Sequence, residues 1–262
     1  MLLVGAGSML GTALLSEKRA GILLTGISHR DFASADLGAY DAVINMAYDP
    51  RIMRQAYDPA LDFDLRVADA AARAGRHFVM ISSRRVYGPA RQWPLPEDAP
   101  KAPADFYGRN KLETEGRVQD IGGSGCTILR LANVFDYEPS RHTFFGIALT
   151  SLRREGRIIL DSNPLVKKDF IPLPDCAGAI LTILSQLPAG IFNLGYGTAT
   201  EIGQIAQWLI EGYGRGELVA TSAEMRDEFL LDITRLTARI EAPARTSIRE
   251  RCVEIGKRLR HA

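Results

Sequence analysis

Short apolar runs alternate with longer segments of helical periodicity over the first half of this chain. The runs are rich in Val, Ile and Leu and have the length of buried strands: Met1–Val4, Ile22–Ile27, Ala42–Asn45, Phe78–Ser82 and Cys126–Leu131. Between them, Asp64–Ala74 and Phe106–Val118 repeat apolar residues at helical spacing. This alternation is typical of a parallel sheet covered by helices on both faces, so it predicts a doubly wound α/β fold.

The pattern loosens after about residue 135, where prolines punctuate shorter elements. Two later segments are regular: Ile191–Gly195 as a strand, and Glu201–Gly212 as a helix that Thr198 opens in a Thr-x-x-Glu capping box. We therefore expect a smaller, partly discontinuous second domain. The expected division is 1–135 plus about 173–196 for the first domain, and 136–172 plus 197–262 for the second.

The charge balance excludes several kinds of partner. The 262 residues include 32 basic and 31 acidic side chains. No net field would therefore gather nucleic acid or an anionic membrane onto the surface, and a small-molecule partner is expected. No apolar stretch approaches the roughly 20 residues that span a bilayer.

The three cysteines indicate a reducing compartment. Cys126, Cys176 and Cys252 are odd in number and too far apart for a zinc motif, which argues against both a disulfide framework and a metal site. Met1 leads directly into an apolar run without a basic region or a cleavage signal. We expect a cytoplasmic protein that holds no metal.

A glycine-rich turn follows the first predicted strand and opens the first helix. In such folds the backbone N–H groups of this turn face the pyrophosphate of a dinucleotide. The alternative is an ordinary tight connection, but the turn's position at the start of an alternating chain favours a cofactor site of the Rossmann type. No lysine follows Gly11, which argues against a P-loop. The predicted contacts are Gly5, Gly7, Ser8, Met9, Leu10 and Gly11.

The end of the second strand favours NADP over NAD. A chain that prefers NAD usually places a carboxylate here for the ribose 2′-hydroxyl. This chain has Ser28, His29 and Arg30, whose hydroxyl, imidazole and guanidinium suit a 2′-phosphate. Asp31 lies close enough to keep NAD as the alternative. We also assign Asp36 and Leu37, in the following loop, to the cofactor site.

Tyr107 and Lys111 are four residues apart in a predicted helix and therefore share one face. A nearby ammonium favours the phenolate and would make Tyr107 a usable general acid or base. Such a pair is common on helix surfaces, so its meaning depends on what surrounds it.

The segment Ser82–Gly88 supplies that context. It reads Ser-Ser-Arg-Arg-Val-Tyr-Gly after a predicted strand, and it resembles the Ser-Ser-x-x-Val-Tyr-Gly motif of the extended short-chain dehydrogenases, the family of nucleotide-sugar epimerases, dehydratases and reductases. The family's catalytic Ser or Thr falls on Ser83. The interval from Ser83 to Tyr107 is similar to the family's own interval between these two residues.

Further motifs extend the resemblance over nearly the whole chain. Asp41–Ala47 resembles the family strand that ends beside the cofactor and implicates Met46 and Ala47 there. Three more segments resemble later family motifs: Leu129–Phe135, Lys168–Ala177 and Phe192–Gly195. The departures are Ser8 in place of the middle glycine of Gly-x-x-Gly-x-x-Gly, and Asp136-Tyr137 in place of Gly-Pro.

The resemblance implies a role for each matched residue. Lys111 is expected on the nicotinamide ribose, and Tyr107 and Ser83 on the reacting oxygen. For substrate contacts the matched positions are Asn133 and Lys168, and the cations Arg84, Arg85 and, less strongly, Arg141 suit a diphosphate. A salt bridge with Asp169 or Asp175 is the alternative for Lys168. His142 is either a substrate contact or a surface loop residue.

The reaction within the family depends on a few positions. The family's 4,6-dehydratases place an Asp-Glu pair directly after the catalytic Thr, where this chain has Arg84 and Arg85. The NADP preference then favours reduction of a nucleotide-linked 4-keto-6-deoxy sugar. The alternatives are a 4-epimerase that retains NAD and, in another class, a non-catalytic NADP-sensing regulator. The resemblance also implies a tendency to form homodimers.

Overall fold

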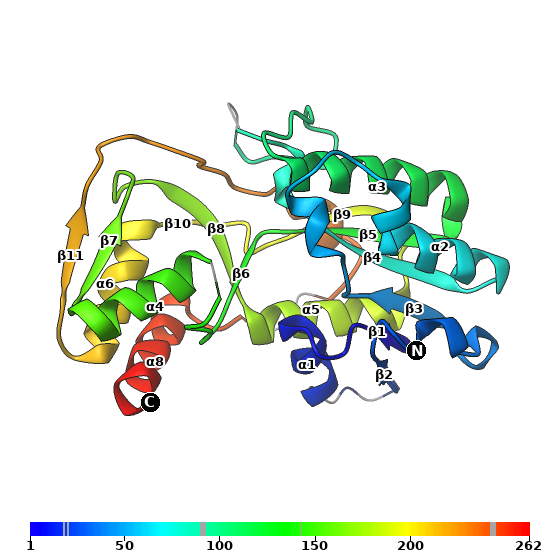
Figure 1. Ribbon diagram of the computed structural model, residues 1–262, viewed down its shortest axis with the longest axis horizontal. Coiled ribbons are helices and arrows are strands. Elements are labelled where there is room, and N and C mark those ends of the chain that lie inside the picture. Colours follow the sequence, from blue (N-terminus) through cyan, green and yellow to red (C-terminus); the bar gives the residue numbers. More distant parts are fainter. Residues whose placement is uncertain (18, 20, 90–92, 142, 242–244) are drawn as a thin grey trace.

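Six parallel strands form the central sheet of the computed structural model, in the order β2-β1-β3-β4-β5-β9 (Figure 1). The strands are β1 (Leu2–Val4), β2 (Thr25–Ile27), β3 (Ala42–Asn45), β4 (His77–Ser83), β5 (Cys126–Leu131) and β9 (Gly190–Leu194). The structure describes residues 1–17, 19, 21–89, 93–141, 143–241 and 245–262. The apolar residues of the inner strands are almost all buried, as a sheet covered on both faces requires.

Helices cover the two faces of this sheet. α2 (Phe63–Arg73) and α3 (Phe106–Gly122) pack together on one face, while α1 (Met9–Ser16) and α5 (Leu173–Gln186) pack together on the other (Figure 1). The predicted doubly wound α/β fold is confirmed. β2 and β3 lie on opposite sides of β1, so the strand order reverses there, and such a reversal opens a crevice at the carboxyl ends of the strands.

The remaining elements form a smaller lobe beside the sheet (Figure 1). β6 (Asn133–Phe135), β8 (Lys167–Pro172) and β10 (Ala199–Glu201) make a mixed sheet, and β7 (Arg157–Leu160) pairs with β11 (Glu217–Ala220). α4 (Phe144–Glu155), α6 (Ile202–Tyr213) and α8 (Ile248–His261) share a second apolar core with these strands. A short helix, α7 (Thr234–Thr237), packs against β9.

Single 3-10 turns connect several elements. Those that bear on the site are η2 (Leu37–Ala39), η3 (Pro50–Met53), η4 (Pro59–Leu61) and η5 (Arg84–Val86). The others are η1 (Phe32–Ser34) and η6 (Gly123–Gly125).

Two local expectations were wrong. The strand predicted from Ile22 begins only at Thr25. Residues 22–24 lie outside any strand, although the carbonyl oxygen of Leu23 accepts a hydrogen bond from the amino group of Met1. The capping box at Thr198 does not form. The chain stays extended in β10 through Glu201, and the Glu201 side chain makes no capping hydrogen bond.

The three cysteines are buried free thiols. Among the described residues, no helix is long and apolar enough to cross a membrane, and no group of three or more His, Cys, Asp and Glu side chains could hold a metal ion.

Candidate active site at the carboxyl edge of the sheet

The glycine-rich turn between β1 and α1 is tightly packed against the end of β3. Gly5 has φ +83°, and a Cβ there would lie 2.8 Å from the backbone nitrogen of Ala47. A Cβ on Gly11 would lie 2.8 Å from the carbonyl oxygen of Gly5. Both positions therefore require glycine. Gly7, in contrast, faces open space, so a ligand can approach its backbone closely.

Ser8 replaces a glycine of the family pattern without disturbing this turn. It is the N-cap of α1, and its Oγ accepts a hydrogen bond from the backbone N–H of Gly11 at 3.0 Å. The first N–H groups of a helix have no partner within the helix. Ser8 takes the N–H of Gly11, and the N–H groups of Met9 and Leu10 before it are available to an anion at this edge of the sheet.

A hollow of about 400 Å³ lies at the point where the strand order reverses. We refer to it as the switch-point hollow. Half of the cofactor contacts predicted from the sequence meet here. Tyr48 joins them as a residue that the sequence analysis missed, although it directly follows Met46-Ala47. The lining residues are Gly5, Gly7, Ser8, Ser28, His29, Met46, Ala47 and Tyr48.

The other predicted cofactor residues do not line the switch-point hollow. Leu10 and Leu37 are buried in the apolar core on either side of the sheet. Met9 is partly buried, Asp36 accepts a hydrogen bond from the N–H of Gly38, and Arg30 is exposed. The side chains of the two leucines therefore belong to the core that packs behind the site and do not contact a bound ligand.

The end of β2 carries no acidic side chain toward the hollow. Ser28, His29 and Arg30 are exposed, and the Ser28 Oγ accepts a hydrogen bond from the backbone N–H of Arg30 at 3.2 Å. None of the described residues that line the hollow is acidic. The groups around it can therefore accommodate a phosphate.

Ser83 ends β4, and Tyr107 lies in the first turn of α3, whose start packs on the chain just after Ser83. A Cβ on Gly108 would lie 2.5 Å from the carbonyl oxygen of Arg85. Asp105, the N-cap of α3, accepts from the N–H of Gly108 at 2.7 Å and is also bonded to the Arg85 guanidinium. The close fit at Gly108 thus brings the helix that carries Tyr107 against the segment that carries Ser83.

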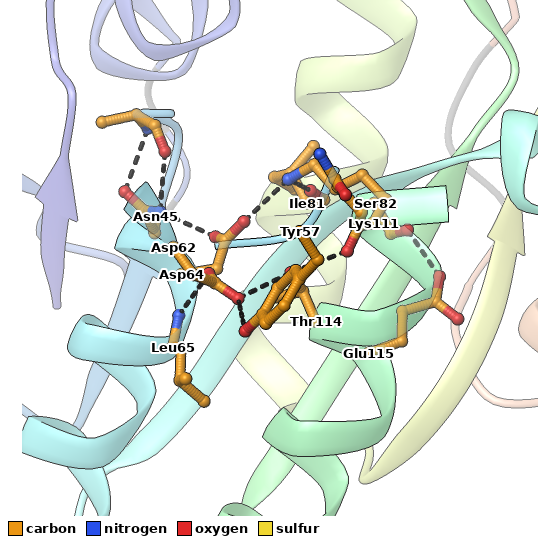
Figure 2. Close-up of polar contacts among 12 residues, drawn as sticks. Asn45, Tyr57, Asp62, Asp64, Leu65, Ile81, Ser82, Lys111, Thr114 and Glu115 are labelled. Carbon is orange, nitrogen blue, oxygen red and sulfur yellow. Dashed lines mark hydrogen bonds and ion pairs between the residues drawn. The ribbon is translucent and has the colours of Figure 1, made fainter. Parts of the chain in front are cut away.

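Lys111 is buried one helical turn below Tyr107, among groups from three elements (Figure 2). Its Nζ donates to Oδ2 of Asp64 at 2.7 Å and to the carbonyl oxygen of Ile81 at 2.8 Å. Burial alone would lower the pKa of Lys111, but the charge of Asp64 outweighs it and holds the pKa of Lys111 above its usual range. The sequence analysis missed Asp64, because an acidic residue in the first turn of a helix has an ordinary role there.

Tyr107 is half-buried, and its ring centre lies 6.4 Å from that of Tyr48. Burial raises the pKa of Tyr107, and the positive charge of Lys111 opposes that rise. The hydroxyl is therefore a protonated phenol at neutral pH, which suits a group that gives up a proton.

Most of the cations predicted for substrate binding are paired within the protein. Arg84 makes a bidentate ion pair with Asp227, and its guanidinium lies 4.1 Å from the centre of the Phe229 ring. Lys168 Nζ lies 3.2 Å from Oδ2 of the same Asp227. Burial works against ionisation of Asp227, yet the two cations lower its pKa to about 2. Asp227 escaped the sequence analysis.

The remaining substrate candidates are Asn133, Arg141 and His142. Asn133 is partly buried at the start of β6, next to β8. The alternative salt-bridge partners of Lys168 accept hydrogen bonds from other groups: Asp169 from the N–H groups of Tyr196 and Gly197, and Asp175 from Thr246. Arg141 pairs with Glu138, and its Nη1 lies 3.4 Å from Sδ of Met9 at the glycine-rich turn. His142 lies outside the described residues.

Several motif residues form a buried polar network instead of lining the hollow. Arg130 pairs with Glu115 and donates to the Tyr87 hydroxyl, which in turn donates to Oδ1 of Asn193. Ser82, which alternates with Ser83 along β4, donates to the same Glu115. Residues of three matched segments, together with Glu115 of α3, therefore hold β4, β5, β9 and α3 together.

Comparison with known proteins agrees with this architecture. A sequence profile described as the NAD dependent epimerase/dehydratase family matches residues 1–195. The chain is 30% identical over 186 residues to a UDP-glucose 4-epimerase from Azospirillum brasilense, a match that covers 62% of this chain and 53% of that protein. It therefore spans about half the length of that curated relative.

Two solved structures are similar along almost the entire chain. RMD from Pseudomonas aeruginosa complexed with NADPH superimposes with a TM-score of 0.84 at 20% identity, covering 99% of this chain and 98% of that one. MoeE5 in complex with UDP-glucuronic acid and NAD gives a TM-score of 0.80 at 22% identity and covers 98% of both chains. At these identities the likeness shows the fold.

Proposed function

Because the chain belongs to the NAD dependent epimerase/dehydratase family, we propose that it is an NADP-dependent reductase of the keto group of a nucleotide-linked 4-keto-6-deoxy sugar. One observation carries the proposal. Ser83 and the Tyr107–Lys111 pair lie on packed elements at the carboxyl edge of the sheet, the edge at which the switch-point hollow opens.

The switch-point hollow fits a dinucleotide. Gly5 and Gly7 expose their backbone to the hollow without a side chain in the way, and the N-cap of α1, Ser8, also lines it. A Cβ on Gly5 would clash with the backbone of Ala47. The similar structures that hold NADPH and NAD support a nicotinamide dinucleotide. The exposed Ser28, His29 and Arg30 support NADP, whose 2′-phosphate they suit.

In the proposed reaction a bound nicotinamide supplies the hydride, and the protein supplies position and a proton. Tyr107 donates its phenolic proton to the carbonyl oxygen of the sugar. The Ser83 hydroxyl donates a hydrogen bond to the same oxygen, and that bond strengthens as negative charge develops there. Lys111 has used two of its three N–H groups on Asp64 and Ile81, which leaves one for a ribose hydroxyl.

The residues after Ser83 argue against dehydration. The first two positions of η5 are arginines, and both are bonded to carboxylates, Arg84 to Asp227 and Arg85 to Asp105. Neither can act as the acid and base that removal of water requires. For the nucleotide diphosphate we propose Lys168 and Asn133 on the neighbouring strands β8 and β6.

The defining experiment supplies NADPH and a nucleotide-linked 4-keto-6-deoxy sugar, with several nucleotides tried in turn. We expect the 4-hydroxy sugar to form with one NADP released per product, followed by NADPH absorbance and chromatography of the sugars. The 30% identity to a UDP-glucose 4-epimerase favours 4-epimerisation as the second candidate. An epimerase would instead interconvert 4-hydroxy epimers without net use of cofactor.

Two further outcomes complete this assay. Binding of NADPH without turnover of any sugar would favour a non-catalytic regulator. Failure to bind either dinucleotide would refute the proposal as a whole. The free thiols also support a cytoplasmic protein. Size-exclusion chromatography tests the homodimer that the family resemblance implies.

The cofactor preference has its own prediction. Ser28→Asp should reverse a preference for NADP, because a carboxylate there accepts ribose hydroxyls and repels a 2′-phosphate. Titration of both cofactors against both proteins measures this. Ser34→Asp, an equal change in the exposed turn η1, is the control and should leave the preference unchanged. Tighter binding of NAD than NADP by the wild type would contradict the assignment.

A further inference from the structure

Asp64 connects the predicted catalytic pair to the central sheet. Its Oδ2 accepts from Nζ of Lys111 at 2.7 Å, and its Oδ1 accepts from Nδ2 of Asn45, at the end of β3, also at 2.7 Å (Figure 2). Asn45 in turn accepts a hydrogen bond from the N–H of Ala47, which lines the switch-point hollow. A single buried carboxylate thus joins α2, α3 and the strand end beside the hollow.

We propose that Asp64 is a positioning residue for the Tyr107–Lys111 pair: it keeps Lys111 charged and holds its ammonium in place beside Tyr107 and the cofactor ribose. The inference rests on the proposed function, and it assigns Asp64 no contact with the substrate.

The need for such a residue follows from burial. The side chains of Lys111 and Asp64 are 6% and 5% exposed. A buried ammonium without a counter-charge tends to lose its proton, and a neutral Lys111 would no longer oppose the rise in the pKa of Tyr107. The carbonyl oxygen of Ile81 accepts a hydrogen bond from Lys111 but carries no net negative charge to balance the ammonium. Asp64 supplies the missing charge at hydrogen-bond distance.

Other charged and titratable groups face the pair from each packed element. Asp62 lies at the N-cap of α2, Tyr48 follows β3, and Arg85 lies in η5. None of these three makes an ion pair or hydrogen bond with Lys111. Asp62 instead accepts from the hydroxyls of Tyr57 and Thr114 and from the N–H of Leu65 (Figure 2). Asp62 is therefore the matched control for Asp64.

The first test compares Asp64→Asn with Asp62→Asn in protein without cofactor. Lys111 in Asp64→Asn has a pKa below that of the unfolded chain, so the folded state binds fewer protons and gains stability as pH rises. Thermal unfolding from pH 6 to pH 10 should show a deficit of Asp64→Asn against wild type that shrinks as pH rises. Asp62→Asn should show a deficit that stays constant.

The second test measures the Kd of NADPH over the same pH range. Loss of the Lys111 charge should weaken binding by Asp64→Asn about tenfold between pH 7 and pH 9.5, whereas wild type and Asp62→Asn should change less than about twofold. A constant stability deficit of Asp64→Asn overturns the inference. If no protein binds NADPH or NADH, the proposed function fails, and the stability measurement still decides the role of Asp64.

A double variant keeps the test decisive if Asp64→Asn does not fold. Asp64→Asn with Lys111→Met removes both charges together and should fold, because no buried charge is left uncompensated. If the double variant also fails to fold, Asp64 is needed for something other than Lys111, and the inference is wrong.

Discussion

Tyr107 and Lys111 share one face of α3, yet their functional groups lie in different surroundings. The phenol lies beside Tyr48 at the edge of the switch-point hollow, and the ammonium lies deeper, between Asp64 and the end of β4. The proposed proton donor and the charge that acts on it are therefore held by different surroundings. Replacing the Tyr107 hydroxyl leaves the contacts of Lys111 with Asp64 and Ile81 intact, whereas loss of the Lys111 charge would also change the pKa of Tyr107.

Tyr107→Phe should lower turnover about 100-fold or more, because it removes the proton donor and leaves the ring in place. The affinity for NADPH should stay within a few-fold of wild type. Steady-state kinetics and a fluorescence titration measure the two quantities. Tyr48→Phe removes a hydroxyl from the neighbouring ring and should keep turnover within a few-fold. Wild-type turnover by Tyr107→Phe would refute the catalytic assignment.

Asp169 gives the fold a pH dependence of its own. The side chain is fully buried, and burial raises its pKa to about 7 although the N–H groups of Tyr196 and Gly197 donate to it. Between pH 4 and pH 7 the folded state thus binds more protons than the unfolded chain, so this group lowers stability as pH rises.

Asp169→Asn should flatten this dependence. The amide does not titrate, so the fall in Tm from pH 4.5 to pH 8 should be smaller in the variant than in wild type, whatever the change in absolute Tm. Asp175→Asn is a matched control at a second buried aspartate. If Asp169→Asn and Asp175→Asn both show the same fall in Tm between pH 4.5 and pH 8 as wild type, Asp169 does not cause the pH dependence of stability.

The residues that the sequence could and could not identify differ in a physical way. Ser83, Tyr107 and the glycines belong to motifs fixed by local spacing, so one stretch of sequence identifies each. Asp64 and Asp227 act on partners 47 and 143 positions away. Those partners are determined by tertiary packing, and no local sequence pattern predicts them.

At the scale of elements, α6 and α8 make the closest helix contact of the smaller lobe. A Cβ on Gly256 of α8 would lie 2.3 Å from the carbonyl oxygen of Leu209, and a Cβ on Gly212 of α6 would lie 2.1 Å from that of Val253. The two backbones therefore touch where both helices lack a side chain, and this contact sets the distance between the helices.

Gly256→Ala should lower the free energy of unfolding by about 2 kcal/mol or more, because the added methyl group must push the two backbones apart. Gly178→Ala in α5, where a Cβ meets nothing within 4 Å, should instead stabilise the protein by about 0.5–1 kcal/mol. Urea unfolding measures both. Equal effects of the two substitutions would show that the close contact does not govern the packing.

Periodicity predicted most elements of the central sheet to within a few residues, because their burial on both faces leaves a continuous apolar signal. It was less informative for the smaller lobe. Strands such as β7 alternate exposed and buried residues over only four positions, too few to separate from a loop. The start of β10 was missed because pairing with β8, not local propensity, keeps residues 199–201 extended.

At the scale of the whole molecule, the segment after β11 ties the smaller lobe to the sheet. It runs back toward the sheet in Figure 1, where Phe229 bridges to Lys168 and Leu231 to Leu95. Asp227 in this segment binds Arg84, the residue directly after Ser83. The division of the chain into two domains remains a proposal, and this ion pair lies where the two would meet.

Asp227→Asn should lower the free energy of unfolding by about 1–2 kcal/mol, because Arg84 is buried and would lose its counter-charge. Glu224→Gln breaks an exposed pair with Arg226 in the same segment and should cost less than about 0.5 kcal/mol. Urea unfolding compares the two variants. A cost of Asp227→Asn no greater than that of Glu224→Gln would mean that the pair does not fasten the segment.

The exposure of Ser28, His29 and Arg30 has a consequence for how such a protein can diverge. These side chains lie on the surface at the end of an edge strand, outside every apolar core of the described residues. Substitutions of Ser28 or Arg30 remove no buried side chain and should cost little stability, so a lineage could change the proposed dinucleotide preference by single, nearly neutral steps. A change at Lys111 or Asp64 must pass through an unpaired buried charge, so selection should hold those two positions together while the preference for one dinucleotide wanders.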